Sequence, residues 1–471
     1  MSLITLIVSR FFLRVKNFLL IRDKRKNLYS ALVVFIATYL LLLAQGKPIW
    51  YFDSGLYYEL THSFYDRAGY FSITNFDAEY RGYVFSFLLL FVKWTHELTA
   101  IAPETIFQFF SALLFALFVC YLIPSFVEKL FAGLRVSIEQ ILLFAALFLF
   151  FWGYNLSYPL TDIPAVFLLI LAVYLAMKEG FVIFFIIGIL LGIITGLRPI
   201  YMISLLPLAA YIWFGKKQLG KLRRVGYLAL FLAGITLVSI PQMLINKKKY
   251  DTLSPLVQTD KAYKHGLYLW QLLWGLSVEK YETNLGKEFP EPKVNFISKR
   301  GQAIHALTIQ KPDTVYNIPT YLHLYVKFPF EMACIQAKHV FNSVDIRDRC
   351  VYDANICDKK YAFTILNFSL LFLFITILMF EGFWRYKKLL YLSAIFLLPY
   401  IATIPTAVET RFALPLFMII YLILAFYTNY ENLYKIYYKP RLTKMIIAWF
   451  LFVLLCLVLS QETYSGMEPF R

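Results

Sequence analysis

Cysteine and acidic residues are scarce in this chain, and their scarcity narrows the classes of protein to which it can belong. Only five of the 471 residues are cysteine, and no two of them have the spacing of a zinc site. Asp and Glu number 29 against 46 Lys and Arg, which leaves a net charge of +17. The basic residues gather in short loops between apolar runs, so the excess fits the positive-inside pattern of membrane proteins better than nucleic-acid binding.

Apolar residues dominate the composition. They make up 60% of the chain, and aromatic residues alone make up 19%. Soluble domains are nearer 45–50% apolar and lack repeated long apolar runs. We therefore predict an all-α polytopic membrane protein. The N-terminus lacks the short apolar core and small-residue cleavage site of a signal peptide, so we expect the first span to be an uncleaved anchor.

The apolar runs predict about eleven transmembrane helices, together with juxtamembrane helices. Residues 1–27 are expected to form a cytoplasmic interfacial helix, because basic residues alternate there with apolar ones. Residues 28–245 form a transmembrane core, 246–361 one large extracytoplasmic loop, and 362–471 the C-terminal transmembrane helices. The first extracytoplasmic loop covers residues 46–103.

The predicted spans alternate in direction, starting from a cytoplasmic N-terminus. They cover residues 28–45, 104–124, 138–156, 163–177, 181–197, 201–214, 225–245, 362–380, 389–404, 413–428 and 445–460. This order makes nearly every cytoplasmic turn basic, although Lys247–Lys249 fall on the outer side. Arg81–Trp94 is too short to cross comfortably, so we expect a juxtamembrane or re-entrant helix there. Gly188, Gly192 and Gly196 predict a smooth face for close helix packing.

Charged residues expected at membrane depth fall on the extracytoplasmic side. Each alone has a structural explanation: Asp162 could offset the dipole of a helix that it starts, Arg198 could reach the lipid headgroups, and Arg411 could pair with a neighbouring acid. Their shared side favours one common site. The residues are Asp53, Glu59, Glu79, Arg81, Asp162, Arg198, Glu409 and Arg411.

These residue types suit the transfer of a group from a lipid-linked phosphate. Arginine is permanently charged and binds phosphate bidentately, so it can hold the phosphate and neutralise it as it leaves. The remaining requirement is a base that removes a proton from the attacking hydroxyl. Asp53, placed just after the first span, fits that role.

In this order the residues resemble the GT-C superfamily of polyprenyl-phosphate-sugar glycosyltransferases, over most of residues 28–430. The nearest branch is the protein O-mannosyltransferase and lipid A aminoarabinose transferase type. The elements that carry the resemblance are Asp53-Ser54-Gly55-Leu56-Tyr57, Glu79-Tyr80-Arg81-Gly82-Tyr83, Tyr158-Pro159-Leu160-Thr161-Asp162-Ile163-Pro164, Gly196-Leu197-Arg198-Pro199 and Glu409-Thr410-Arg411-Phe412.

The resemblance implies roles for these residues. The catalytic carboxylates would be Asp53 and Asp162. The substrate-binding residues would be Tyr57, Glu59, Glu79, Arg81, Arg198, Glu409 and Arg411. Ser54 stands where many members carry a second acid, so a divalent metal is not favoured.

The implied reaction moves a sugar from a polyprenyl-phosphate donor to a glycan, lipid or protein acceptor of the cell envelope, with inversion. It would take place on the extracytoplasmic side of the plasma membrane. One alternative is an envelope polysaccharide polymerase or ligase, which would rely on arginines of outer loops and not need Asp53. Another is a transporter or flippase for lipid-linked sugars, which predicts internal repeats, and no convincing repeat is found.

The large loop contains three further candidate features. Cys350 and Cys357 share one hydrophilic segment and are candidates for a local disulfide if it is extracytoplasmic; two free thiols are the alternative. Tyr321–Phe341 alternates apolar and polar residues in the manner of an interfacial helix. Trp270 and Trp274 could stack on sugar rings or anchor the loop at the interface.

Overall fold

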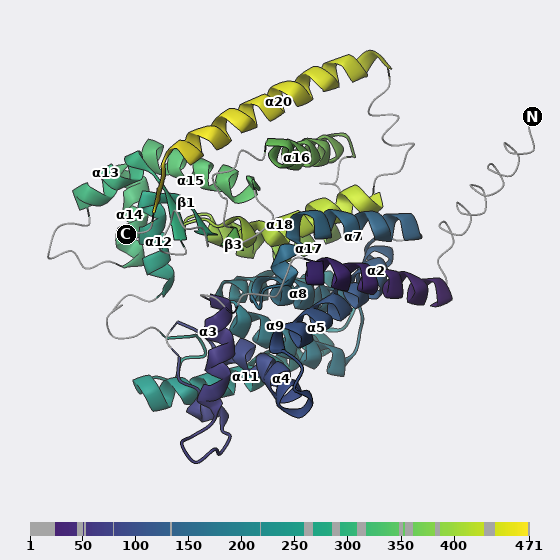
Figure 1. Ribbon diagram of the computed structural model, residues 1–471, viewed down its shortest axis with the longest axis vertical. Helices are drawn as coiled ribbons and strands as arrows, with labels where there is room; N and C mark the ends of the chain where they lie inside the picture. The colour runs from purple at the N-terminus through teal and green to yellow at the C-terminus, as the bar shows by residue number, and fades with distance from the viewer. Residues whose placement is uncertain are drawn as a thin grey trace, which may run out of the picture.

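The protein is built almost entirely from α-helices (Figure 1). The computed structural model describes residues 24–44, 50, 53–78, 80–131, 134–216, 218–258, 267–284, 293–308, 317–347, 352–353, 361–381, 387–427 and 439–469. Within these ranges, six helices are long and apolar enough to cross a bilayer, and five shorter apolar helices accompany them. The chain is therefore an α-helical membrane protein.

The first half of the chain forms a bundle of helices, most of them apolar. Its helices are α2 (Lys24–Ala44), α3 (Asp53–Glu59), α4 (Tyr83–Thr99), α5 (Pro103–Leu117), α6 (Ile123–Leu130), α7 (Ile138–Trp152), α8 (Asp162–Ala176), α9 (Phe181–Leu197), α10 (Leu205–Ala210) and α11 (Lys221–Tyr250). A π-helical turn, Phe118–Leu122, joins α5 to α6 in one continuous stretch. α4 is the helix that we predicted over Arg81–Trp94 as juxtamembrane or re-entrant. It is not one of the eleven apolar helices counted above.

Residues from the predicted large loop fold into a compact group at one end of these helices, which we call the end unit (Figure 1). Its helices are α12 (Leu267–Ser277), α13 (Lys299–Thr308), α14 (Ile318–Lys327) and α15 (Pro329–Val344). Its strands are β1 (Val278–Asn284), β2 (Lys293–Ile297), β3 (Tyr352–Asp353) and β4 (Met467–Pro469). They form one sheet in the order β3-β1-β2-β4, in which β2 is antiparallel to β1 and β4, and β3 is parallel to β1.

Two features of the end unit differ from the sequence analysis. The small sheet was not predicted. The single interfacial helix expected over Tyr321–Phe341 is instead two helices, α14 and α15, which meet at Phe328 and Pro329. Proline lacks the N–H that would continue the earlier helix and is well tolerated in a first helical turn, so the break falls there.

The C-terminal part returns to long apolar helices. They are α16 (Tyr361–Glu381), α17 (Lys387–Thr403), α18 (Leu414–Leu422) and α20 (Lys439–Ser465). A 3-10 turn, Thr410–Ala413, precedes α18 and a π-helical turn, Ile423–Tyr427, follows it. α20 packs on α16 and leads the chain to the end unit, where β4 joins the sheet (Figure 1).

The predicted glycine face packs as expected. A Cβ atom on Gly188 would lie 2.0 Å from the Phe231 carbonyl oxygen, and one on Gly192 would lie 2.8 Å from the Val238 Cβ. Both contacts are with α11, so the smooth face lets α9 and α11 approach closely. Gly196 instead faces α4, where an added Cβ would lie 2.3 Å from Val84 Cγ2.

The two ends of the bundle differ in their charged residues. α8 has 15 residues and rises about 22 Å from Asp162 towards Lys178. At the Lys178 end, Lys216 donates a 3.0 Å hydrogen bond to the Lys178 carbonyl oxygen. At the Asp162 end lies Arg198, which pairs with Asp162. The basic residues Lys178 and Lys216, predicted to be cytoplasmic, therefore lie at the opposite end of the bundle from these candidate site residues.

α11 continues past the predicted boundary between core and large loop at residue 245, as far as Tyr250. Its last turn contains Lys247–Lys249. Lys249 pairs with Asp77, and Lys248 Nζ lies 3.2 Å from the Thr74 carbonyl oxygen. The three lysines that did not fit the charge pattern thus belong to a helix end that rests on the first loop.

Some expectations fall outside the described residues. They concern most of the predicted N-terminal interfacial helix, Glu79, and the cysteine pair Cys350 and Cys357. Among the described residues, Cys334 and Cys456 are free thiols.

We predict that Gly188→Ala lowers the thermal stability of the detergent-purified protein, because its Cβ must force α9 and α11 apart. The expected loss is about 1–3 kcal/mol, the usual cost of overpacking. Gly220→Ala is the matched control, since a Cβ there would meet nothing within 4 Å. Equal melting temperatures for the two variants would contradict the close packing of α9 on α11.

Candidate functional site

Six of the eight charged residues singled out in the sequence lie together in the structure. Arg81 Nη2 is 2.5 Å from Asp53 Oδ1, and Arg198 Nη2 is 2.5 Å from Asp162 Oδ1. Arg411 joins the two pairs, at 3.6 Å from Asp53 Oδ2 and 3.5 Å from Asp162 Oδ2. Its Nε donates a 2.7 Å hydrogen bond to Glu409 Oε2. We call these six residues the ionic cluster: Asp53, Arg81, Asp162, Arg198, Glu409 and Arg411.

Local sequence explains how helix ends deliver three of these side chains. Asp162 is the first residue of α8, where a carboxylate is stabilised by the helix dipole. Arg198 follows the last residue of α9 and has extended backbone angles, because Pro199 disfavours a helical conformation in the residue before it. Asp53 is the first residue of α3.

Glycines bring the two arginines of the first half near each other. A Cβ on Gly82 would lie 2.8 Å from the Gly196 carbonyl oxygen, so the start of α4 touches the end of α9. Arg81 precedes the first of these glycines, and Arg198 lies two residues after the second. Larger residues at the two glycine positions would separate these two arginines of the ionic cluster.

Backbone strain occurs beside Arg81. Tyr80 has φ 61°, in the left-handed region that costs a non-glycine residue about 1–2 kcal/mol. The Arg81 Nη1 atom donates a 3.2 Å hydrogen bond to the carbonyl oxygen of this same residue. Such strain persists only where surrounding contacts hold it, and it concentrates at functional sites.

The cluster is mostly removed from solvent, and its carboxylates differ in access. The Asp53 side chain is 20% exposed, whereas the Asp162 and Glu409 side chains are 6% and 1% exposed. Burying an ion pair costs several kcal/mol of desolvation for each ion. Apolar side chains of similar size often stabilise a fold equally well or better. A functional reason for the cluster is therefore favoured, and Asp53 is its most accessible carboxylate.

Several polar atoms of the cluster are buried without a hydrogen-bond partner in the protein. They are Asp162 Oδ2, Glu409 Oε1 and Arg81 Nε. Leaving such an atom unsatisfied costs about 1–3 kcal/mol. Carboxylate oxygens can accept hydrogen bonds from hydroxyl groups and a guanidinium can donate to phosphate, so these atoms suit a polar ligand carrying both groups.

Glu409 has a perturbed acidity. Burial raises the pKa of its carboxyl group to about 7, with the Arg411 guanidinium opposing the shift and Glu282 and Asp162 adding to it. The side chain therefore titrates near neutral pH, and its protonation makes the cluster more positive.

Aromatic side chains extend from the cluster onto the end unit. The Arg198 guanidinium lies 4.9 Å from the centre of the Phe412 ring, and Phe412 lies 6.0 Å from Tyr281. Tyr281 stacks on Trp274 at 4.7 Å, and Trp274 lies 5.2 Å from Trp270. These four rings, which we call the aromatic row, extend from Arg198 to α12.

Sequence reasoning missed Tyr281 and Glu282, which β1 brings beside the Glu409–Arg411 segment. Tyr281 N donates to the Val408 carbonyl oxygen at 2.8 Å, and Glu282 accepts a hydrogen bond from Thr410. The available signal was the alternation of Val278, Lys280 and Glu282, which places opposite charges on one face of a strand.

The remaining predicted site residues lie differently. The Tyr57 ring is at the edge of the cluster, 5.5 Å from the Arg81 guanidinium and in edge contact with Phe85. Glu59 is exposed at the far end of α3, away from the charged atoms described above. Its predicted role in substrate binding therefore has no geometric support, because α3 carries it past the cluster.

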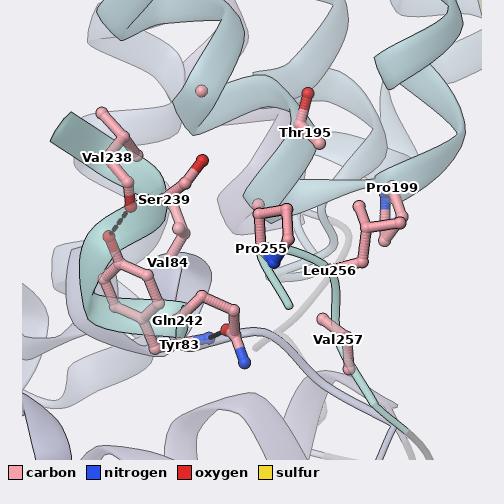
Figure 2. A pocket seen from close by; sticks show the side chains of 12 residues that line it. Tyr83, Val84, Thr195, Pro199, Val238, Ser239, Gln242, Pro255, Leu256 and Val257 are labelled. Carbon is pink, nitrogen blue, oxygen red and sulfur yellow. Dashed lines mark hydrogen bonds between the residues drawn. The ribbon is translucent and has the colours of Figure 1, made fainter. Parts of the chain in front are cut away.

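A small recess opens beside the end of α9 (Figure 2). Figure 2 shows Tyr83 and Val84 of α4, Thr195 of α9, and Val238, Ser239 and Gln242 of α11 around it, with Pro255, Leu256 and Val257 on the remaining side. The Tyr83 hydroxyl donates a 2.7 Å hydrogen bond to the Val238 carbonyl oxygen. Pro199, the residue that follows Arg198 in the chain, also lines the recess. The recess is therefore next to the ionic cluster in sequence.

Within the described part of the chain, no group of three or more His, Cys, Asp or Glu side chains is arranged to hold a metal ion. The carboxylates of the cluster face arginines instead. Each of the three carboxylates has a guanidinium nitrogen at 2.5–2.7 Å.

Comparison with protein-family models and with curated proteins finds no match to this chain.

We predict that Glu409 makes the stability of the protein depend on pH. Its pKa is raised to about 7 in the folded state, so its stabilising contribution is complete below the ordinary value near 4.5 and is lost as pH rises through about 7. Between pH 4.5 and pH 8 the wild type should lose about 1–3 kcal/mol that Glu409→Gln does not lose. Melting temperatures over this range test the difference, and parallel profiles for the two proteins would contradict it.

Proposed function

We propose that this protein is a membrane glycosyltransferase of the GT-C type, which transfers a sugar from a polyprenyl-phosphate donor to an acceptor of the cell envelope. The observation that supports this best is the ionic cluster, in which three guanidiniums and three carboxylates from distant parts of the chain meet at one end of an apolar helix bundle. A lipid carrying a phosphosugar needs such a combination.

The arginines would bind the donor phosphate. The two terminal nitrogens of Arg411 lie 3.5 and 3.6 Å from carboxylates, longer than the 2.7–2.9 Å of a charge-assisted hydrogen bond. They can therefore donate to a phosphate without breaking a short pair. Arg198 adds a second guanidinium on the side of the recess, and its short pairing with Asp162 holds it in place.

Asp53 would act as the general base. Its carboxylate takes the proton of the acceptor hydroxyl while the hydroxyl oxygen attacks the anomeric carbon of the donor sugar. The bond between that carbon and the phosphate oxygen breaks, the bonding electrons leave with the polyprenyl phosphate, and the anomeric centre inverts. Asp53 suits this role because it is the most exposed carboxylate of the cluster and can meet an acceptor arriving from water.

The surroundings of the cluster also favour a sugar substrate. Asp162 Oδ2 and Glu409 Oε1, which lack a hydrogen-bond partner in the protein, can accept hydrogen bonds from sugar hydroxyls. Phe412, next to both Arg198 and Arg411, offers an apolar surface for the ring face of a sugar whose phosphate those arginines hold. The aromatic row continues this surface away from the lipid, where the acceptor would lie.

We place the site on the extracytoplasmic side of the plasma membrane, in a chain of about eleven spans. The support is the separation of charge along the bundle: basic residues such as Lys178 and Lys216 lie at the end opposite the cluster. An envelope acceptor and an outer-leaflet donor follow from that orientation.

Asp53→Asn is expected to reduce the transfer rate at least about a hundredfold, because amide nitrogen cannot accept the acceptor proton. The measurement is transfer of radiolabelled sugar from its polyprenyl phosphate to an envelope acceptor by the purified protein in liposomes. Asp251→Asn makes the same chemical change at an exposed residue paired with Lys247 and should keep full activity. Full activity of Asp53→Asn would remove Asp53 from the mechanism.

Arg198→Ala is expected to raise the KM for the donor about tenfold or more while leaving the KM for the acceptor unchanged, since it loses a charge-assisted contact with phosphate. Arg223→Ala, at the exposed start of α11, is the matched control. An unchanged dependence of rate on donor concentration would contradict a phosphate role for Arg198.

A further inference from the structure

The segment that carries Arg411 docks on the end unit through backbone hydrogen bonds. Residues 404–413 connect α17 to α18, and Arg411 lies in the last turn of this connection. Tyr281 N donates to the Val408 carbonyl oxygen at 2.8 Å, and Ala407 N donates to the Gln271 carbonyl oxygen at 3.3 Å. The segment therefore lies along β1 and α12, both of which belong to the end unit.

Side chains of the end unit hold the earlier part of the same segment. His339 Nδ1 lies 2.6 Å from the Ile404 carbonyl oxygen, and the Tyr321 hydroxyl lies 3.4 Å from the Pro405 carbonyl oxygen. Gly275 of α12 allows the close approach: a Cβ there would be 2.6 Å from the Pro405 oxygen and 2.5 Å from the Thr406 carbonyl carbon. The segment thus has little freedom up to residue 408.

Glu282 holds the last part, directly beside Arg411. The Thr410 hydroxyl donates a 3.0 Å hydrogen bond to Glu282 Oε1, and Thr410 lies between Glu409 and Arg411 in the chain. Glu282 is itself fixed by Lys280, whose Nζ is 2.9 Å from Glu282 Oε1. Lys280 is fully buried and donates a further 2.9 Å hydrogen bond to the Asp345 carbonyl oxygen.

We propose that Glu282 and Thr410 are positioning residues for Arg411, so that the end unit takes part in binding the phosphate of the donor. This inference rests on the proposed function, because it assigns Arg411 to a lipid phosphate. Glu282 does not touch the substrate and acts through the hydrogen bond to Thr410.

The reason that Arg411 needs positioning is the pair of carboxylates that face it from the helix bundle. Asp53 and Asp162 lie just beyond hydrogen-bond distance of its terminal nitrogens. If Thr410 were free to shift, Arg411 could close that gap and pair tightly with one of them. Its N–H groups would then no longer be available to phosphate, and the affinity for the donor would fall.

The test measures binding of undecaprenyl monophosphate to the full-length protein in nanodiscs, with undecaprenol as the control for the lipid chain. Thr410→Val keeps the shape of the side chain and removes the hydroxyl, whereas Thr410→Ser keeps the hydroxyl. We expect Thr410→Val to weaken phosphate-dependent binding about tenfold, and Thr410→Ser to stay within about twofold of wild type.

Glu282→Ala removes the acceptor of the hydrogen bond that Thr410 donates. It replaces Thr410→Val in the binding test if that variant does not fold. The double variant should bind no more weakly than Glu282→Ala alone, because Thr410→Val breaks no hydrogen bond that Glu282→Ala leaves intact. Equal binding by Thr410→Val and Thr410→Ser, or additive losses in the double variant, would overturn the positioning role.

The two proposals fail in distinguishable ways. If wild type binds undecaprenyl monophosphate no better than undecaprenol, the proposed donor is wrong and the positioning role falls with it. If wild type binds the phosphate and the Thr410 and Glu282 variants bind equally well, the donor stands and only the positioning role is wrong.

Discussion

The arrangement of this protein's polar interior depends on one buried guanidinium. Arg411 is surrounded by carboxylates from α3, from α8 and from its own segment, and its side chain is 9% exposed. A charge so far from water requires compensation, so each of these acids must reach the same point. The requirement ties the first loop, the start of α8 and the connection between α17 and α18 to one place at the end of the bundle.

Apolar packing makes this meeting possible. Gly188 and Gly192 let α9 lie against α11, and Gly82 lets the start of α4 touch α9 at Gly196. These contacts bury no charge, yet they set where Arg81 and Arg198 emerge from the helix ends. The end unit then supplies the last side of the site, because β1 and α12 hold the segment that leads to Arg411. The cluster is thus shared between two parts of the fold.

The apolar helices could be predicted from sequence, because long apolar runs are local signals. The bounds of α9 matched the expected 181–197, for example. The pairing of Asp162 with Arg198 and the central place of Arg411 could not be predicted, since they depend on contacts between segments far apart in the chain. Tyr281 and Glu282 lie on the single strand β1, whose alternation was too brief to distinguish from loop sequence. Glu59 shows that proximity in sequence is also an unreliable guide. It is close to Asp53 in the chain, but the two residues lie at opposite ends of α3, a helix of 7 residues.

The charge of the cluster is suited to a reaction in which negative charge grows on phosphate. Three arginines face three carboxylates, and the raised pKa of Glu409 leaves one of these partly protonated near neutral pH. In the proposed reaction the donor is a phosphodiester with one negative charge, and the departing polyprenyl phosphate is a monoester whose second ionisation lies near pH 6. A site with a small positive excess would hold the donor weakly and the leaving group more strongly. Interactions that strengthen as the bond breaks lower the barrier, whereas equal binding of donor and transition state would not. A fully neutral cluster would lack this difference, so in the proposed reaction the burial of Glu409 would have a chemical purpose beyond pairing with Arg411.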